Sequence, residues 1–156
     1  MDKLFELLKK HNLTISTAES CTGGLIASAI TDVSGASSLF GTGVVTYSND
    51  AKMKLIGVKK ETLDQYGAVS EQTAFQMAEG VLKLADSDVS VAVTGIAGPT
   101  GGTPEKPVGL GYIGVSGKYG TFAYKNIFKG NRDEVRKQTV SRAFELVYDY
   151  LSKFYG

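Results

Sequence analysis

The chain has 156 residues, a formal net charge of +1, one Cys, one His and 19 Gly. This length suits one compact domain, and the near-neutral charge argues against a general electrostatic footprint for nucleic acid. A single Cys and a single His exclude an intramolecular disulfide, Cys-rich zinc sites and His-cluster metal sites. Glycine occurs at about one residue in eight, against a usual ~7%, so the glycine positions call for explanation.

The first twelve residues predict a short amphipathic helix, because Leu4, Phe5, Leu7 and Leu8 alternate with charged residues. A signal peptide needs an uninterrupted apolar run of about 7–15 residues, and a membrane span needs about 20. Neither pattern occurs in the sequence. We therefore expect a cytoplasmic protein with no membrane partner.

Further along the chain, helical periodicity alternates with short β-branched runs, and a Gly-containing turn separates the last two strands. The predicted strands are residues 14–18, 40–47, 89–94, 108–116 and 121–128. The predicted helices are residues 25–33, 49–56 (capped by Asn49 and Asp50), 60–66 (closed by Gly67), 71–85 (capped by Ser70) and 132–154. This order predicts one three-layer α/β/α domain over residues 1–156, with a mixed, mainly parallel sheet that ends in a β-hairpin.

Ser20 is the first candidate for chemistry, because it follows a strand and precedes a Gly-Gly helix start. A hydroxyl at such a place can attack a carbonyl while nearby backbone N–H groups stabilise the oxyanion. A simpler interpretation is that Ser20 or Thr22 caps the helix. The neighbouring Cys21 would need a base, and nothing supports its pairing with His11, the only His, so a small buried residue is the better interpretation.

Without a suitable His, a Ser nucleophile needs another base, and a desolvated neutral Lys can act as one. Lys52 lies about one turn into a predicted helix, and Tyr47 ends the preceding strand. Carboxyl ends of parallel strands share one edge of an α/β sheet, so Ser20 and Lys52 can meet there. The alternative is a solvated basic stretch that also includes Lys54, Lys59 and Lys60.

Two further segments suggest anion binding. The loop of residues 95–107 holds four glycines and all three prolines, and glycine lets backbone amides approach an anion. It is not a Walker A loop, and the alternative is a plain surface loop. Arg132 and Arg136 lie one turn apart at the start of the last helix, where they can grip a phosphate or simply form an exposed charged face. No acidic cluster has metal-ligand spacing, so we expect no metal.

Taken together, these motifs resemble the CinA C-terminal domain family, in order and over nearly the whole chain. The segments are TAESCTGG (17–24), GVVTYSNDAK (43–52), GAVS (67–70), TGIAGPTGG (94–102), KPVGLGY (106–112) and GNRDEVR (130–136). That family includes nicotinamide-nucleotide amidases, which hydrolyse the carboxamide of nicotinamide mononucleotide to nicotinate mononucleotide and ammonia. The resemblance implies a cytoplasmic hydrolase that needs no cofactor, binds a small nucleotide and not nucleic acid, and forms a homodimer.

The resemblance also implies roles for individual residues. Ser20 is the expected nucleophile, Lys52 the general base and Tyr47 an assisting or proton-relaying group. The expected substrate-binding residues are Thr22, Gly23 and Gly24 at the oxyanion turn, Thr94, Gly95 and Gly98 beside the nucleotide, and Arg132 with Arg136 at the phosphate.

Two alternative functions fit the same residues. The chain can be a non-catalytic nucleotide-binding domain or an interaction domain associated with competence or DNA damage, or it can hydrolyse another amide. Many family members carry an additional N-terminal domain with pyrophosphatase activity that this sequence lacks, so we expect no such activity from it.

Overall fold

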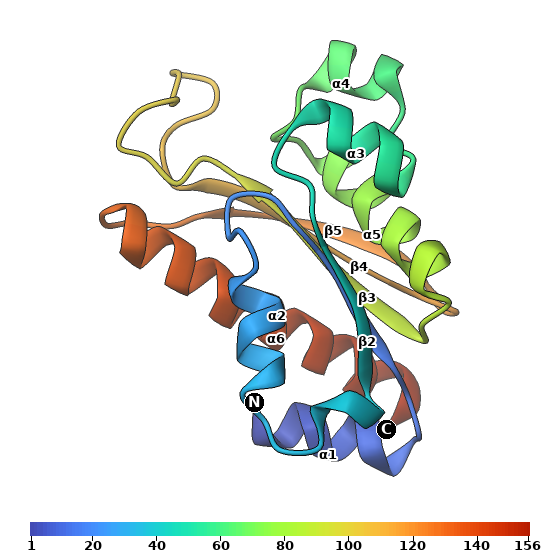
Figure 1. The fold of residues 1–156 in the computed structure, drawn as a ribbon. Coiled ribbons are helices and arrows are strands. Elements are labelled where there is room, and N and C mark those ends of the chain that lie inside the picture. The colour runs from blue at the N-terminus through green and yellow to red at the C-terminus, as the bar shows by residue number, and fades with distance from the viewer.

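The computed structural model describes residues 1–156 and places one five-stranded sheet between two layers of helices (Figure 1). The strands are β1 (Ile15–Glu19), β2 (Phe40–Val45), β3 (Val89–Gly95), β4 (Leu110–Gly117) and β5 (Gly120–Ile127). The helices are α1 (Asp2–Lys10), α2 (Leu25–Thr31), α3 (Asn49–Ile56), α4 (Lys60–Tyr66), α5 (Glu71–Ala85) and α6 (Arg132–Tyr155), with a 3-10 turn η1 (Ala36–Ser38).

The strand order is β2-β1-β3-β4-β5. β1 runs parallel to both β2 and β3, whereas β4 is antiparallel to β3 and forms a hairpin with β5. The predicted class, a three-layer α/β/α arrangement with a mixed sheet that ends in a hairpin, is therefore confirmed.

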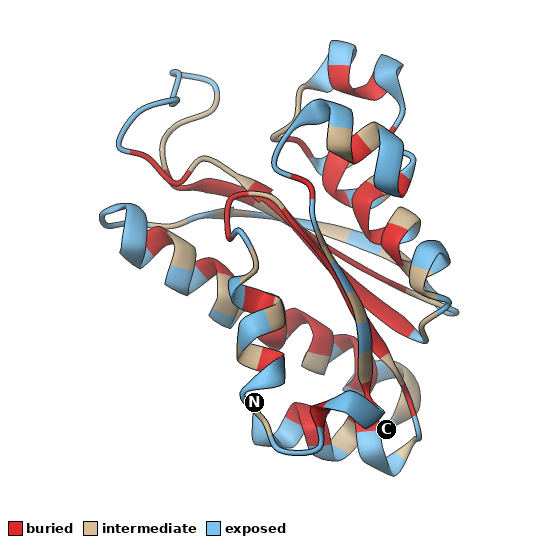
Figure 2. Cartoon of the chain, in the orientation of Figure 1, coloured by how far each residue is buried: buried red, intermediate tan, exposed pale blue.

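Each face of the sheet has its own apolar core, and the buried positions of the helices point towards the strands (Figure 2). One core joins α1, α2 and α6 to the face that carries Ile15, Val91 and Val93. The other joins α3, α4 and α5 to the face that carries Ala18 and Ala92. Alternate residues of β1 and β3 thus serve opposite cores, as the period of two in a strand requires.

The ends of several elements differ slightly from the prediction. Asn49 and Asp50 do not cap α3, because its N-cap is Ser48, whose hydroxyl accepts a hydrogen bond from the Ala51 N–H at 3.0 Å. The predicted cap of α5, Ser70, is confirmed. The predicted loop before β2 contains the short turn η1.

The topology gathers the chemically interesting segments at one edge of the sheet. The carboxyl ends of β1, β2 and β3 lie side by side, because these three strands are parallel and β1 lies between the other two. The helix that follows β1 covers one face, and the helix that precedes β3 covers the other. Such a switch point opens a crevice at the carboxyl edge, which is the usual place for a ligand in this fold class. None of the helices is both long and apolar enough to cross a membrane.

Candidate active site

Ser20 and Lys52 meet at this edge of the sheet. Ser20 directly follows β1, and Lys52 lies in the first turn of α3, on the chain that leaves β2. The Nζ atom of Lys52 is 3.1 Å from Oγ of Ser20 and 2.7 Å from the carbonyl oxygen of Thr46. The two candidate residues that the sequence analysis paired are therefore in hydrogen-bond contact.

Lys52 is buried, with 1% of its surface exposed. Burial lowers the pKa of its ammonium group below the ordinary value of 10.5, and no carboxylate contacts Nζ to offset this effect. Lys54, Lys59 and Lys60 are exposed, so the solvated basic stretch describes them but is wrong for Lys52. A buried Lys beside a Ser hydroxyl has the surroundings of a general base.

The turn after Ser20 is organised by Glu19, which is 1% exposed. One carboxylate oxygen of Glu19 accepts hydrogen bonds from the Thr22 hydroxyl at 2.6 Å and the Ile26 N–H at 2.8 Å, and the other accepts from the Ala27 N–H at 3.1 Å. Glu19 therefore supplies the anion at the start of α2. The interpretation of Ser20 or Thr22 as a helix cap is wrong, because the N-cap position is Gly24 and has no side-chain cap.

Arg136, in the second turn of α6, holds the same turn from the helix layer that α6 shares with α2. Its Nε donates to the carbonyl of Cys21 at 3.0 Å, and its Nη2 donates to the carbonyl of Thr22 at 3.1 Å. The N–H groups of Cys21 and Thr22 have no acceptor within the chain, whereas the Gly23 N–H donates to the carbonyl of Ser20 at 3.0 Å. Free N–H groups that follow a nucleophile are candidate oxyanion donors.

Cys21 is buried, and burial raises the pKa of its thiol to about 11. His11 caps the end of α1, before β1 begins, and its ring packs against Tyr155. Cys21 instead follows the far end of β1, so the strand separates the two residues. The expectation of a small buried residue without a His partner is confirmed.

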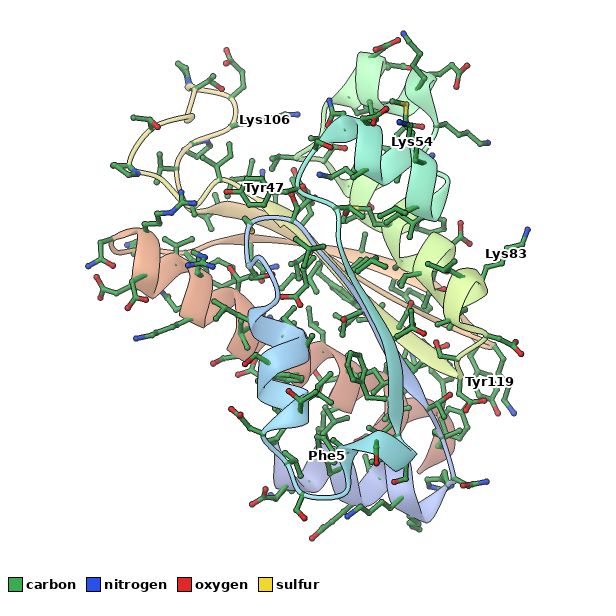
Figure 3. The ribbon with its side chains drawn as sticks, viewed as in Figure 1. Phe5, Tyr47, Lys54, Lys83, Lys106 and Tyr119 are labelled. Carbon is green, nitrogen blue, oxygen red and sulfur yellow. The ribbon has the colours of Figure 1, made fainter.

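Tyr47 and Arg132 form the rim of the site. Arg132 donates to the Tyr47 hydroxyl at 3.1 Å and to the carbonyl of Gly98 at 2.9 Å. Tyr47 is 61% exposed and lies between the end of β2 and the long loop after β3 (Figure 3). Its hydroxyl has no hydrogen bond to Lys52 or Ser20. Tyr47 therefore contacts Arg132, the residue expected to bind the phosphate, and not Lys52, the expected base.

A cavity of about 280 Å³ opens between these groups. Its lining includes Ser20, Lys52, Tyr47, Thr94, Gly95, Gly98 and Arg132 from the expected set. Two of the lining side chains are basic and none is acidic, which suits an anionic ligand. Thr22, Gly23, Gly24 and Arg136 are not among its lining residues.

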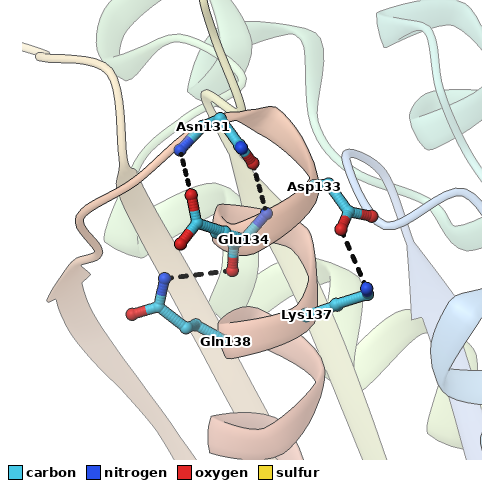
Figure 4. A network of polar contacts seen from close by, with 5 residues as sticks. All are labelled: Asn131, Asp133, Glu134, Lys137 and Gln138. Carbon is cyan, nitrogen blue, oxygen red and sulfur yellow. Dashed lines mark hydrogen bonds and ion pairs between the residues drawn. The ribbon is translucent and has the colours of Figure 1, made fainter.

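The start of α6 does not offer an open anion site. The Asn131 side chain accepts from the Glu134 N–H at 2.9 Å, and the Glu134 carboxylate accepts from the Asn131 N–H at 3.1 Å (Figure 4). The nearby Lys137 pairs with Asp133 and not with the site. Side chains of the helix itself thus accept hydrogen bonds from N–H groups at its N-terminus. The Arg132 guanidinium is the group there that remains available for a phosphate.

The long loop between β3 and β4 is anchored at several points. The Thr94 hydroxyl donates to the carbonyl of Ala68 at 2.8 Å, which ties the end of β3 to the segment before α5. Lys106 extends towards α4 and donates to the carbonyl of Tyr66 (Figure 3). Gly98 has a φ of 83° and packs against Val108, so a side chain there would be strained. The loop that forms this wall of the cavity is therefore held in place by hydrogen bonds and packing, and the plain surface loop is not the better interpretation.

Sequence reasoning missed Glu19, the Thr46 carbonyl, Asn49 and the Ala68–Val69 wall. One signal pointed to Glu19, since an acidic residue at the end of a strand of apolar and hydroxyl residues needs partners when it is buried. The Thr46 carbonyl and the wall carry no signal of their own, because ordinary backbone and apolar groups make them.

Comparison with known proteins places this chain in a family. The family model of the CinA C-terminal domain matches residues 1–151. A CinA-like protein of Endomicrobium trichonymphae is 58% identical over 141 residues, which are 90% of this chain and 33% of that protein. The chain spans about a third of the length of the curated relatives that it matches.

Solved structures agree with this match. A CinA superfamily protein from Klebsiella pneumoniae has a TM-score of 0.94 at 32% identity, over 97% of this chain and 95% of that one. The competence/damage inducible protein CihA from Agrobacterium tumefaciens has a TM-score of 0.88 at 44% identity, over 96% of each chain.

Proposed function

This chain belongs to the CinA C-terminal domain family, and we propose that it is an amidohydrolase that converts nicotinamide mononucleotide and water to nicotinate mononucleotide and ammonia. One observation carries the proposal. A buried Lys52 without an acidic partner contacts the hydroxyl of Ser20 at 3.1 Å, inside a cavity with basic walls. A non-catalytic nucleotide-binding domain has no need to bury an ammonium group, because burial without a counter-charge costs free energy.

In the first half of the reaction, the neutral amine of Lys52 takes the proton from Ser20 Oγ as Oγ attacks the amide carbon. The C–O bond forms and the carbonyl electrons move to the oxygen, which the free N–H groups of Cys21 and Thr22 stabilise. The oxyanion then collapses and the C–N bond breaks. The leaving nitrogen takes the proton from Lys52 and departs as ammonia, which leaves an ester on Ser20.

In the second half, water attacks the ester carbon and gives its proton to Lys52. Collapse of the second oxyanion breaks the bond to Ser20 Oγ, which recovers its proton from Lys52, and the carboxylic acid is released. The Thr46 carbonyl accepts a hydrogen bond from Nζ at 2.7 Å, so it holds the amine beside Oγ through both halves. One base thus moves every proton in the cycle.

Recognition of the substrate needs a cation away from the reacting centre. Arg132 is exposed at the rim, and its guanidinium uses two of its donors on Tyr47 and Gly98. Guanidinium has five N–H donors, so it keeps others for a phosphate. The Tyr47 ring lines the same cavity and offers an apolar face to the pyridine ring.

The test is the release of ammonia from nicotinamide mononucleotide by the wild type, Ser20→Ala and the control Ser28→Ala, which alters an exposed residue of α2. We expect Ser20→Ala to lose about 10⁴-fold or more in kcat and the control to match the wild type. Wild-type turnover by Ser20→Ala would refute the assignment. A panel of other nucleotide and nucleoside amides separates this substrate from a different amide, and inactivity of the wild type on the whole panel would favour the non-catalytic binding or competence-associated interaction domain.

A further inference from the structure

Arg136 of α6 holds the turn that follows Ser20. This residue has no role in the proposed chemistry and does not line the cavity. Arg136 is half-buried and reaches from α6 to the carbonyls of Cys21 and Thr22, at 3.0 and 3.1 Å. The partners are more than 110 positions apart in the chain. A cation that binds two successive carbonyls fixes the orientation of two successive peptide planes.

Because peptides are planar, the contacts of Arg136 with the Cys21 and Thr22 carbonyls also fix the directions of the Thr22 and Gly23 N–H groups. In a trans peptide the C=O and the following N–H point in opposite directions. The Thr22 carbonyl points to Arg136, and the Gly23 N–H accordingly reaches the carbonyl of Ser20 at 3.0 Å. The side of the turn away from Arg136 is therefore the side that faces the Ser20 carbonyl.

The peptide between Cys21 and Thr22 is oriented in the same way. Arg136 also holds the carbonyl of Cys21, so the Thr22 N–H points away from the guanidinium. This N–H has no acceptor within the chain. Thr22 itself is kept in place by its hydroxyl, which donates to Glu19 at 2.6 Å. The Thr22 N–H is therefore oriented, has no hydrogen bond within the chain and lies two residues after Ser20.

We propose that Arg136 is a positioning residue that aims the Thr22 N–H at the oxyanion formed on Ser20, and this inference rests on the proposed hydrolase function. The guanidinium also polarises the peptide, because a charge-assisted bond to the Cys21 carbonyl strengthens the donor at the other end of the same plane. Gly23 suits this turn because its φ of 58° lies in the left-handed region that glycine adopts without strain.

The test compares Arg136→Met, Arg136→Lys and Arg136→Ala with the control Arg142→Met, which removes a surface guanidinium that pairs with Glu145 on the same helix. Two rates are measured after circular dichroism has shown that the variants fold: ammonia release from nicotinamide mononucleotide, and covalent labelling of Ser20 by a fluorophosphonate. The phosphoryl oxygen of the probe occupies the position of the oxyanion, so labelling reports the same donor without the nucleotide.

We expect Arg136→Met to lose about 10²–10³-fold in kcat, the usual effect of one oxyanion donor, with KM changed by less than about threefold. Ser20 labelling should slow in parallel. Lysine lacks the planar guanidinium that donates to two carbonyls at once, so Arg136→Lys should recover only part of the wild-type kcat. Free guanidinium ion at millimolar concentration should restore at least about tenfold to Arg136→Ala and nothing to Arg136→Met, whose side chain fills the space.

Labelling and turnover of Arg136→Met within about threefold of the wild type would overturn the inference, as would a loss that appears only in KM. If the wild type is labelled at Ser20 but releases no ammonia, the proposed substrate fails while the labelling series still decides the role of Arg136. If the wild type is neither labelled nor active on any amide, the proposed function and this inference fall together.

Discussion

Gly80 of α5 and Ile56 of α3 meet backbone to backbone, because a Cβ at Gly80 would overlap the carbonyl oxygen of Ile56. Ile56 lies one helical turn after Lys52 and is itself buried in the core that α3 shares with α5. The close approach therefore fixes the height of α3 above the sheet. That height decides whether Nζ of Lys52 reaches Ser20.

Gly80→Ala should be destabilising although Ala is the better helix former. The overlap involves backbone atoms that cannot rotate away, and overpacking costs about 1–3 kcal/mol, which exceeds the gain of about 1 kcal/mol from replacing Gly in a helix. We expect a lower midpoint in urea and a lower kcat, because α3 carries the base. Gly41→Ala is the control, since a Cβ at Gly41 has nothing within 4 Å. Equal stability of the two variants would contradict the close contact.

Lys52→Met should abolish turnover and at the same time stabilise the fold near neutral pH. Burial lowers the pKa of Lys52 below 10.5 in the folded state, so the unfolded chain binds the proton more tightly. Each unit of lowering costs about 1.4 kcal/mol. This cost is full below the folded pKa and disappears as pH rises towards 10.5.

The measurement is the free energy of unfolding of wild type and Lys52→Met at several pH values. The advantage of the variant should shrink as pH rises. The control Lys54→Met removes an exposed ion pair with Asp50 and should show no such trend. An advantage that grows with pH would contradict the buried, desolvated amine.

The pH dependence of turnover should follow the same group. Only the neutral amine accepts the Ser20 proton, so kcat/KM should rise with pH and level off once Lys52 has lost its proton. The lowered pKa places the midpoint below 10.5. Lys52→Arg keeps the charge but cannot lose its proton, so kcat should fall about 10³-fold or more across the whole range. A fully active Lys52→Arg would show that Lys52 is not the base.

Glu19→Gln should cost both stability and rate. The carboxylate accepts three hydrogen bonds with its two oxygens, whereas an amide has one oxygen and would set its NH₂ against a buried N–H. An unsatisfied buried group costs about 1–3 kcal/mol. Because the turn that carries Ser20 begins here, kcat should fall more than KM rises. Glu6→Gln, on the exposed side of α1, is the control for urea unfolding and ammonia release.

Arg132→Met should weaken substrate binding and leave the chemical step nearly intact. Hydrogen bonds to a charged group contribute about 1.5–3 kcal/mol, so we expect KM for the mononucleotide to rise about 10–100-fold. The nucleoside without its phosphate should show the same KM with both proteins. Lys129→Met alters an exposed cation nearby and serves as control. An equal effect on nucleotide and nucleoside would show that Arg132 does not read the phosphate.

Local chemistry made most of the elements predictable. The apolar period of α5, its Ser70 cap and the hairpin after the Pro- and Gly-rich loop depend on residues a few positions apart. Helix periods and caps are properties of short windows, and the parallel direction of the first three strands follows from the intervening helices. The sequence by itself therefore determined the layers and the sheet edge at which Ser20 and Lys52 can meet, while the family resemblance implied their roles as nucleophile and base.

Contacts between distant segments were decided only by the tertiary structure. Of the neighbouring lysines, Lys52 is buried because α5 holds α3 against the sheet, whereas the sequence alone left a solvated basic stretch open as an alternative. Arg136 resembles a phosphate ligand in sequence, yet it binds two carbonyls 115 and 114 residues away. Burial and long-range hydrogen bonds depend on which elements pack together, and a pattern of neighbours in the chain cannot specify that.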